Sequence, residues 1–221
     1  MNRKKESCNL GQYAINEVET KSFGTTKQIL AVHEVYRLGG KPTIVKIEEG
    51  KTTSTVYFQI VGEKFYFAAY FSMLPKVSLI GTGTEPHTSV YLNASSYILT
   101  YSEICAFTSL IPTRGWSVGD MTPSGKSTRK FSSVQFEESN GPGLFSKKLR
   151  SLLDFLEQDK LGVLRLVTNA EAYVQTVMEF HNGNTMLGGP NIDKMSLRRL
   201  SDFELDIDFD FYATGNFFKE E

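Results

Sequence analysis

The clearest alternation of hydrophobic and polar positions lies near the C-terminal end of the chain, in residues 204–212. The apolar members are Leu205, Ile207, Phe209 and Phe211. The polar members, on the other side, are Glu204, Asp206, Asp208, Asp210 and Tyr212. Alternation with a period of two predicts a β-strand with one buried and one solvated face. The sequence therefore predicts an antiparallel sheet with a wet, strongly acidic face, preceded by a short amphipathic helix.

The region between Pro86 and this strand predicts alternating helices and strands. Thr100 and Glu103 form a capping box that starts a helix, and Pro112 stops it. The strongest helical pattern begins at Phe145, with leucines at three- and four-residue spacings. Strands are predicted at 87–94, 130–137, 161–167 and 172–180, and a further helix from Asp193. This order indicates the α+β class, with a mostly antiparallel sheet and two or three helices packed on it.

The first part of the chain reads as a small β-rich unit. Residues 53–60 and 65–71 surround a turn and are typical of a hairpin. Shorter strands are predicted at 43–47 and 76–80, residues 81–86 as a turn or linker, and residues 27–37 as either a strand or a short helix. We therefore predict three regions, namely a loose polar segment (1–24), a β-rich unit (25–86) and an α+β domain (87–221).

The hairpin carries tyrosines on one of its two faces. Tyr57 lies on the outgoing strand, and Tyr66 and Tyr70 lie on the return strand. Tyrosine suits both core rims and interfaces, because its ring is apolar and its hydroxyl is polar. Core packing is the default interpretation. Exposure of the three rings would instead make this face a partner-binding surface.

Composition limits the classes of partner. The 221 residues have a formal net charge of -1, so no global field holds nucleic acid or an anionic membrane. The first residues do not suggest a signal peptide, and no run of about 18 apolar residues suggests a membrane span. Cys8 and Cys105 form neither a disulfide framework nor a CxxC motif. We expect a cytoplasmic protein with no membrane partner, and the sequence argues against nucleic acid.

Two motifs that suggest ligand chemistry fail on spacing. Gly125-Lys126-Ser127 lacks the Walker spacing, because five residues rather than four separate Gly119 from Gly125. We interpret this segment as a solvated loop. The three histidines, His33, His87 and His181, lack the i, i+4 spacing of metal ligands. His181 lies in a turn signature and is expected to be exposed.

Charged clusters are interpreted as solvated surfaces or binding surfaces. Carboxylates on one face of a strand lie about 6–7 Å apart and need oxygens from another element to hold a metal. The acidic strand is more simply a solvated face that protects an edge, with a partner surface as the next alternative. Arg129 and Lys130 lie near Trp116 in sequence, and basic residues with an aromatic ring are typical of proteins that bind single-stranded nucleic acid. Acidic residues follow each basic group, however, which favours a solvated surface. We predict no catalytic residue, no cofactor and no metal.

One family resemblance is visible. The chain contains a capped helix ending in Leu110-Ile-Pro-Thr113, a Gly119-Asp120 loop, a leucine-rich helix and the closing segment 197–212. In this it resembles the bacterial family catalogued as domain of unknown function 4279, over about residues 87–214. A tryptophan usual in that family after the loop is missing from strand 131–136, since Trp116 lies in the loop. The resemblance implies an accessory protein of a kind that includes immunity proteins beside secreted toxins, and it identifies no functional residue.

Two functions remain open from the sequence. The first is a non-catalytic protein-binding module, an immunity protein that neutralises a bacterial toxin by forming a complex with it. Many toxin domains are basic, so the acidic strand with Tyr212 would accelerate association. The alternative is a small-molecule-binding protein or enzyme with a pocket between the two units, where Glu103, Asp120 or the acidic strand supplies polar groups. The sequence does not indicate the oligomeric state.

Overall fold

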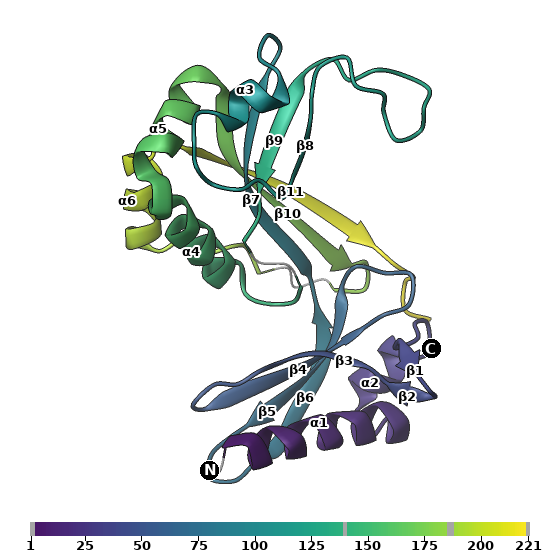
Figure 1. The fold of residues 1–221 in the computed structure, drawn as a ribbon. Coiled ribbons are helices and arrows are strands. Elements are labelled where there is room, and N and C mark those ends of the chain that lie inside the picture. Colours follow the sequence, from purple (N-terminus) through teal and green to yellow (C-terminus); the bar gives the residue numbers. More distant parts are fainter. Residues whose placement is uncertain (1–2, 139–140, 185–187, 220–221) are drawn as a thin grey trace.

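The protein folds into two units, each organised around its own β-sheet, and the fold class is α+β as predicted. The structure is a computed structural model that describes residues 3–138, 141–184 and 188–219, with side chains described from residue 10 onward. Figure 1 shows the C-terminal unit above the N-terminal unit, with the end of the chain returning to the N-terminal unit. Within the described residues, no helix is both long and apolar enough to cross a membrane.

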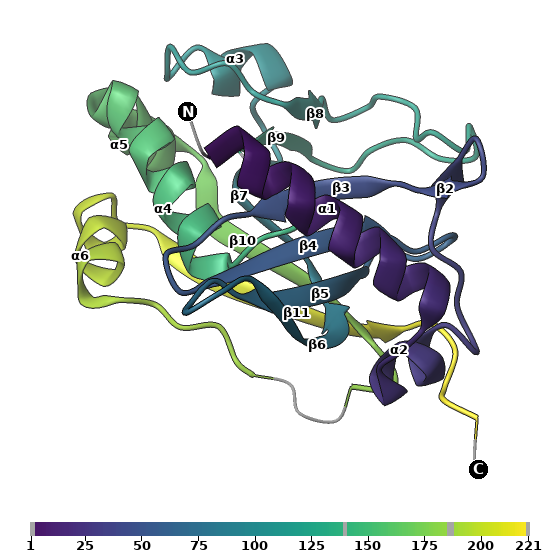
Figure 2. The ribbon, with the colours of Figure 1, turned by 90° about the horizontal axis from the view of Figure 1, so that it is seen from below.

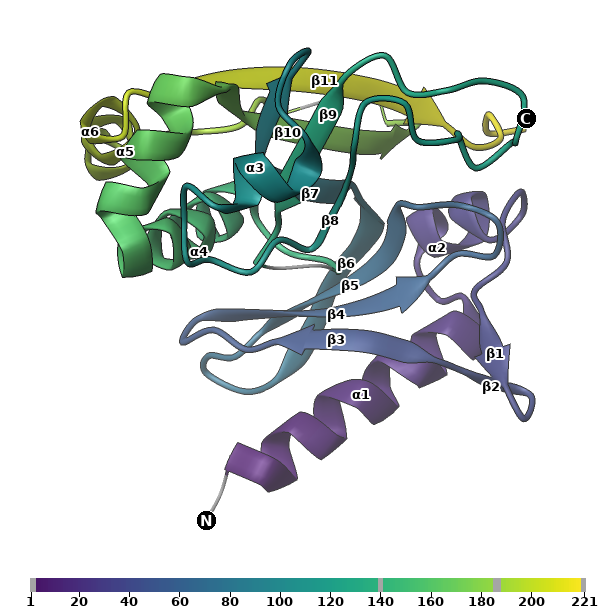
Figure 3. The same ribbon diagram turned by 45° about the horizontal axis from the view of Figure 1, so that its top comes forward.

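The N-terminal unit is a four-stranded antiparallel sheet with a helix on one face. Its strands, in sheet order, are β3 (Ile44–Glu48), β4 (Thr53–Gln59), β5 (Tyr66–Ser72) and β6 (Ser78–Glu85). Helix α1 (Arg3–Thr20) crosses the face turned away from the C-terminal unit (Figures 2 and 3). The shorter elements are α2 (Gly24–Ile29), β1 (Arg37–Leu38) and β2 (Lys41–Pro42). The predicted hairpin is confirmed as β4 and β5.

Helix α1 corrects the prediction of a loose segment at residues 1–24. Leu10, Ala14 and Val18 recur every four residues and are almost completely buried, so they form one stripe of the helix. They pack into the cluster that contains Phe58 and Phe67 of the sheet. The stripe is narrow and polar residues surround it, so its helical state depends on packing against the sheet rather than on local propensity.

The C-terminal unit is a five-stranded mixed sheet with helices on one face. Its strands, in sheet order, are β11 (Asp206–Thr214), β10 (Glu171–His181), β7 (His87–Ser96), β9 (Ser132–Phe136) and β8 (Arg114–Trp116). All neighbours pair antiparallel except β10 and β11, which are parallel. The helices are α3 (Tyr101–Cys105), α4 (Phe145–Leu156), α5 (Lys160–Asn169) and α6 (Lys194–Asp202). They cover a core that includes Leu92, Val134, Leu149 and Val174, all fully buried.

Several boundaries within these units differ from the predictions. The strand predicted at 161–167 is helix α5, where Asp159 caps the N-terminus by accepting a hydrogen bond from the Gly162 amide. A short apolar run fits a strand and a buried helix equally well, and the cap decides for the helix. The linker predicted at 81–86 is mostly strand, since β6 continues to Glu85. The capping box at Thr100 is confirmed, but α3 ends at Cys105, well before Pro112.

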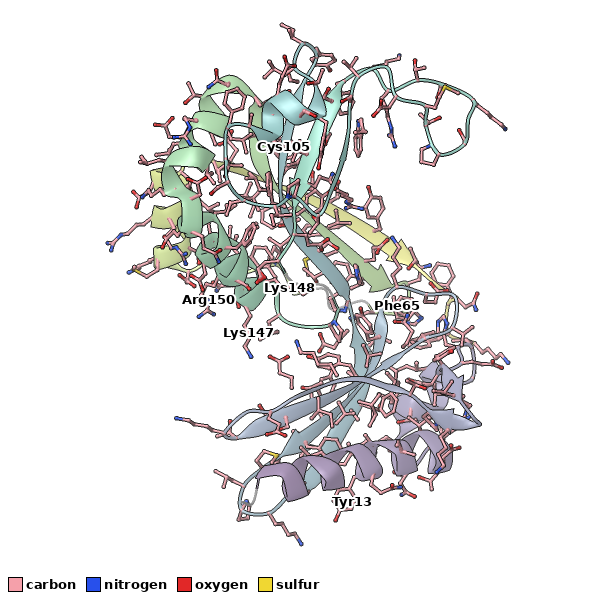
Figure 4. The ribbon with its side chains drawn as sticks, viewed as in Figure 1. Tyr13, Phe65, Cys105, Lys147, Lys148 and Arg150 are labelled. Carbon is pink, nitrogen blue, oxygen red and sulfur yellow. The ribbon has the colours of Figure 1, made fainter. Side chains whose placement is uncertain are left out.

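Polar contacts join the two units on either side of Pro86, the residue that separates β6 from β7. The Lys46 ammonium donates to the Pro142 carbonyl at 2.8 Å, and the Lys64 ammonium pairs with Glu179 at 2.9 Å. Lys147 pairs with Glu48. Figure 4 shows Lys147 and Lys148 near the end of α4 that faces the N-terminal unit. These contacts bridge the two sheets at the junction.

Candidate functional site

The C-terminal sheet has one face that no described helix covers, and we call it the open face. In Figure 1 the helices of this unit lie on the left of the sheet, and the open face is turned to the right. Side chains alternate along each strand, so every second residue points to this face. Its members are Tyr91, Asn93, Arg114, Trp116, Ser133, Gln135, Tyr173, Gln175, Asp206, Asp208 and Asp210.

The strand register arranges these side chains in rows that run from an acidic edge to a basic edge. Asp206 of β11 pairs with Tyr173, Tyr173 with Asn93, Asn93 with Gln135, and Gln135 with Arg114 of β8. The face thus carries carboxylates at one edge, amides and aromatic rings in the middle, and a guanidinium at the other edge. Negative charge therefore lies at the β11 edge of this face, and positive charge lies at the β8 edge.

The middle of the open face is a shallow trough of about 320 Å³ with a polar floor. Ser133 Oγ and Gln135 Nε2 donate to Asn93 Oδ1 at 2.9 and 3.3 Å. From beside the trough, the Arg114 Nε donates to Gln135 Oε1, and outside the trough on the same face Gln175 Nε2 donates to Asp210 Oδ2 at 3.3 Å. Because the buried amides bond to one another, the floor is held in one arrangement.

Aromatic rings form the walls of this trough, and two arginines lie over them. Tyr91, Trp116, Phe131 and Tyr173 all line it. The Arg129 guanidinium lies 4.1 Å from the centre of the Trp116 ring, and that of Arg114 lies 5.5 Å from the centre of the Tyr91 ring. These cation–π contacts orient both guanidinium groups at the trough. Trp116 belongs to strand β8, which corrects the prediction that it lies in a loop.

The predicted acidic residues lie along the edge of this face. Asp206 and Asp208 are exposed, Asp210 is half-buried, and Tyr212 is 51% exposed on the same strand. Glu204 precedes β11 in a left-handed conformation, with φ of 57°. Leu205, Ile207 and Phe209 pack toward the helices as predicted, whereas Phe211 is 54% exposed because the helices do not extend over it. Strand β11 pairs only with β10 among the described strands, so it is an edge strand.

Metal binding finds no support along this strand. Among the described residues, no group of three or more histidine, cysteine, aspartate or glutamate side chains is arranged to hold a metal ion. The carboxylates of β11 follow one another along a single strand, whereas a coordination shell needs several oxygens that converge on one point.

The three tyrosines of the hairpin lie in the junction between the units. Tyr57 and Tyr66 are each 4% exposed, and Tyr70 is half-buried. The Tyr57 hydroxyl donates to Glu48 at 3.1 Å and the Tyr70 hydroxyl donates to Glu85 at 2.8 Å. Burial raises the pKa of both tyrosines, and the neighbouring carboxylates raise it further. Tyr57 and Tyr66 are therefore inaccessible to a partner in this structure, in agreement with the core interpretation.

A pocket of about 420 Å³ opens beside these tyrosines, between the two units. Tyr70 and Glu85 line it from the N-terminal unit, and Phe145, Met178 and Phe180 from the C-terminal unit. Burial raises the pKa of the Glu85 carboxyl, and repulsion from Glu48 adds to the shift, while the hydrogen bond from Tyr70 opposes it. A raised carboxyl pKa in a concave site is typical of functional residues.

Lys148 lies next to this pocket and is 5% exposed. Its ammonium donates to the carbonyls of Thr88 and Gly141, both at 2.6 Å. Burial lowers its pKa to about 8, and the nearby Lys46 contributes to the shift. The sequence reasoning missed this residue, because a lysine within a basic run of an amphipathic helix reads as solvated.

Glu103 and Asp120, the polar groups suggested for such a pocket, lie elsewhere. The Thr100 amide donates to Glu103 at 2.7 Å in the capping box of α3. The Ser117 amide donates to Asp120 at 2.7 Å. Both carboxylates therefore satisfy backbone amides in the C-terminal unit and do not line the junction pocket.

His181 is buried, which corrects the prediction that it is exposed. It is 2% exposed and its ring centre lies 4.8 Å from that of His33, at the edge where the two units meet. Phe65 and Phe218 also contact it. Burial and the neighbouring His181 lower the pKa of His33. Residues far apart in the sequence form this cluster, so the turn signature around His181 gave no indication of it.

Comparison with known proteins gives one finding. The family model described as domain of unknown function (DUF4279) matches residues 85–214, which is more than half of the chain. No curated protein and no solved structure matches the chain. The matched segment contains the whole open face, and the N-terminal sheet lies outside it except for the last residue of β6.

Proposed function

This chain belongs to the family of domains of unknown function 4279, and we propose that it is a non-catalytic protein-binding module that uses the open face. The observation that carries this proposal is the trough with Tyr91, Trp116 and Tyr173 in its walls and Arg114 beside it. Tyrosine, tryptophan and arginine are the residues that contribute most to protein interfaces. A rigid floor of mutually bonded amides reduces the entropy lost on binding.

Charge indicates the kind of partner. Asp206 and Asp208 are exposed at the edge strand β11, with Asp210 beside them. A row of carboxylates attracts a basic surface and raises the association rate more than it raises affinity. The edge strand also offers unpaired backbone groups for β-augmentation. We therefore propose a partner with a basic surface that contacts β11 first and then fills the trough.

The finer proposal is that this partner is a toxin of the same bacterium. An immunity protein needs a rigid complementary surface and no catalytic residues, and many toxins that act on nucleic acids are basic. The family resemblance points the same way, since it implies accessory proteins that include immunity proteins. The complex would form in the cytoplasm, where such a toxin would otherwise act.

Co-purification of the tagged protein with the products of adjacent genes tests this proposal. We expect a stoichiometric complex with a basic protein, and loss of that protein's toxicity on co-expression. Recovery of the protein alone, with no toxic neighbour, would contradict the immunity role.

A matched pair of variants tests the acidic edge. Replacing Asp206→Asn and Asp208→Asn together should lower the association rate by about tenfold at low salt and flatten its salt dependence. Asp210 is left in place because it accepts a hydrogen bond from Gln175. The control replaces Glu34→Gln and Glu49→Gln, which are exposed on the N-terminal unit, and should leave the rate unchanged. Equal rates for both variants would remove β11 from the interface.

The junction pocket supports a second function, small-molecule binding between the units. Its volume of about 420 Å³ lies in the usual range for ligand sites. A ligand there would contact both units at once, so it would also hold their relative orientation.

A further inference from the structure

We propose that the junction pocket binds a primary amine with an apolar body, and that Glu85 and Tyr70 hold its ammonium group. This inference rests on the second proposed function, ligand binding between the units. It goes further by naming the chemical class of the ligand and the side chains that recognise it.

The lining of the pocket combines apolar surface with neutral polar side chains, such as Thr84, Ser146 and Asn191, and one charged group. Pro86, Leu144, Phe145, Met178 and Phe180 supply hydrocarbon and aromatic surface from both units. Glu85 is the one charged side chain among the described residues that line the pocket. A ligand of matching chemistry has a largely apolar body and a single charged group that is complementary to a carboxylate.

Glu85 lacks the cation that neighbouring carboxylates have. Glu48 pairs with Lys147, and Glu179 pairs with Lys64. No lysine or arginine of the described residues forms an ion pair with Glu85. Its hydrogen-bond donor in the structure is the Tyr70 hydroxyl. A carboxylate removed from water without a cationic partner is unfavourable, and a bound cation removes that penalty.

Lys148 does not take this role, although its amine is close to the pocket. Its ammonium bonds to the carbonyls of Thr88 and Gly141, and this holds α4 against β7. The site that remains for a cation is therefore the pocket itself.

An ammonium group fits this site better than the other ligand groups of its size. It donates up to three hydrogen bonds, so it can bond both to the Glu85 carboxylate and to the oxygen of the neighbouring Tyr70 hydroxyl. A carboxylate ligand would be repelled by Glu85. A neutral hydroxyl would leave the Glu85 charge uncompensated.

Calorimetric titration with three probes of nearly equal shape tests the inference. The probes are phenethylamine, phenethyl alcohol and hydrocinnamate, which carry an ammonium, a hydroxyl and a carboxylate on the same aromatic body. At neutral pH we expect saturable binding of phenethylamine at one site, about tenfold weaker binding of the alcohol, and no binding of hydrocinnamate. Glu85→Gln should weaken phenethylamine binding by about tenfold or more, and the exposed control Glu49→Gln should leave it unchanged.

The outcomes separate this inference from the function on which it rests. Binding of the alcohol or of hydrocinnamate without a preference for the amine would overturn the inference and leave a ligand site of another class. Failure of all three probes would overturn both.

A measurement on the unmodified protein covers the case in which Glu85→Gln does not fold. The phenethylamine ammonium stays charged throughout the acidic range, whereas Glu85, whose pKa burial raises above its ordinary value, takes up a proton as the pH is lowered from neutral. The affinity for phenethylamine should therefore fall by about fivefold or more between neutral pH and the acidic range in which Glu85 is protonated. An affinity that does not depend on pH would overturn the inference.

Discussion

The two sheets of this protein each have a face rich in tyrosine and acidic residues, and the two faces differ in how far they are buried. The hairpin face of the N-terminal sheet carries Tyr57 and Tyr66, both buried in the junction. The open face of the C-terminal sheet carries Tyr91 and Tyr173, which remain half-buried in the wall of a trough. Similar strand patterns thus produce a structural contact in one sheet and an accessible surface in the other.

The difference lies in what each face meets. Pro86 turns the chain directly from β6 into β7, so the hairpin face is brought against the C-terminal unit. Its hydroxyls then need partners, and Glu48 and Glu85 supply them. The open face has no such neighbour among the described residues, and its amides bond to one another instead. A tyrosine-rich strand therefore indicates a binding surface only where no other unit covers it.

The largest effect that separates the two faces is expected for Tyr57→Ala. The ring is buried and its hydroxyl donates to Glu48, so its removal leaves a cavity and takes one hydrogen bond from a carboxylate that keeps its ion pair with Lys147. We expect the free energy of unfolding to fall by about 3–5 kcal/mol in urea denaturation. Tyr212→Ala is the control on the C-terminal sheet, and it should change stability by less than about 0.5 kcal/mol because that ring is 51% exposed. Similar losses for both variants would contradict the contrast between the faces.

A smaller effect is expected at Lys148, through the pH dependence of stability. Its pKa is lowered from 10.5 to about 8 in the folded state. Between these values the unfolded state binds the proton more tightly, so this group makes stability rise with pH. Below about pH 8 both states are protonated and the contribution is constant.

Lys148→Met removes this titration, and urea midpoints at several pH values measure the consequence. The stability of the natural protein relative to the variant should increase as the pH rises from about 8 to about 10. The difference in stability between the two proteins does not contain the contribution of the tyrosines, because these titrate in both. If the stabilities of the natural protein and of Lys148→Met changed with pH in parallel, Lys148 would not be desolvated in the junction.

The elements that the sequence predicted correctly are those specified by local pattern. The hairpin of β4 and β5, the capping box at Thr100, helix α4 and strand β11 all have strong periodicity or cap signals within a short window. Helix α1 was missed because its apolar stripe is narrow and its helical state depends on a sheet that lies elsewhere in the sequence. Helix α5 was missed because its short apolar run also fits a strand, although Asp159 caps it locally.

The candidate sites could be predicted only in part, because they too depend on segments that lie far apart in the sequence. The acidic residues of β11 could be placed on one face, because alternation fixes the side of a strand. The trough depends on the order of five strands from distant segments, which brings Trp116 of β8 into the same face as Tyr173 of β10. The junction pocket depends in addition on the packing of two units. Neither arrangement follows from residue spacing along the chain.

The smallest effect is expected from neutralising single carboxylates, and its sign distinguishes the two regions. Burial raises the pKa of Glu85 above its ordinary value of 4.5, so its ionised form opposes folding at neutral pH. Glu85→Gln should therefore raise the melting temperature near pH 7. This gain should disappear as the pH falls below 4.5, where the carboxyl is protonated in both states.

Asp206→Asn, on the exposed edge strand, should leave the melting temperature unchanged at both pH values. A loss of stability in Glu85→Gln at neutral pH would mean that the carboxylate is a structural partner of Tyr70. A gain would mean that the junction retains a destabilising group, as ligand sites commonly do.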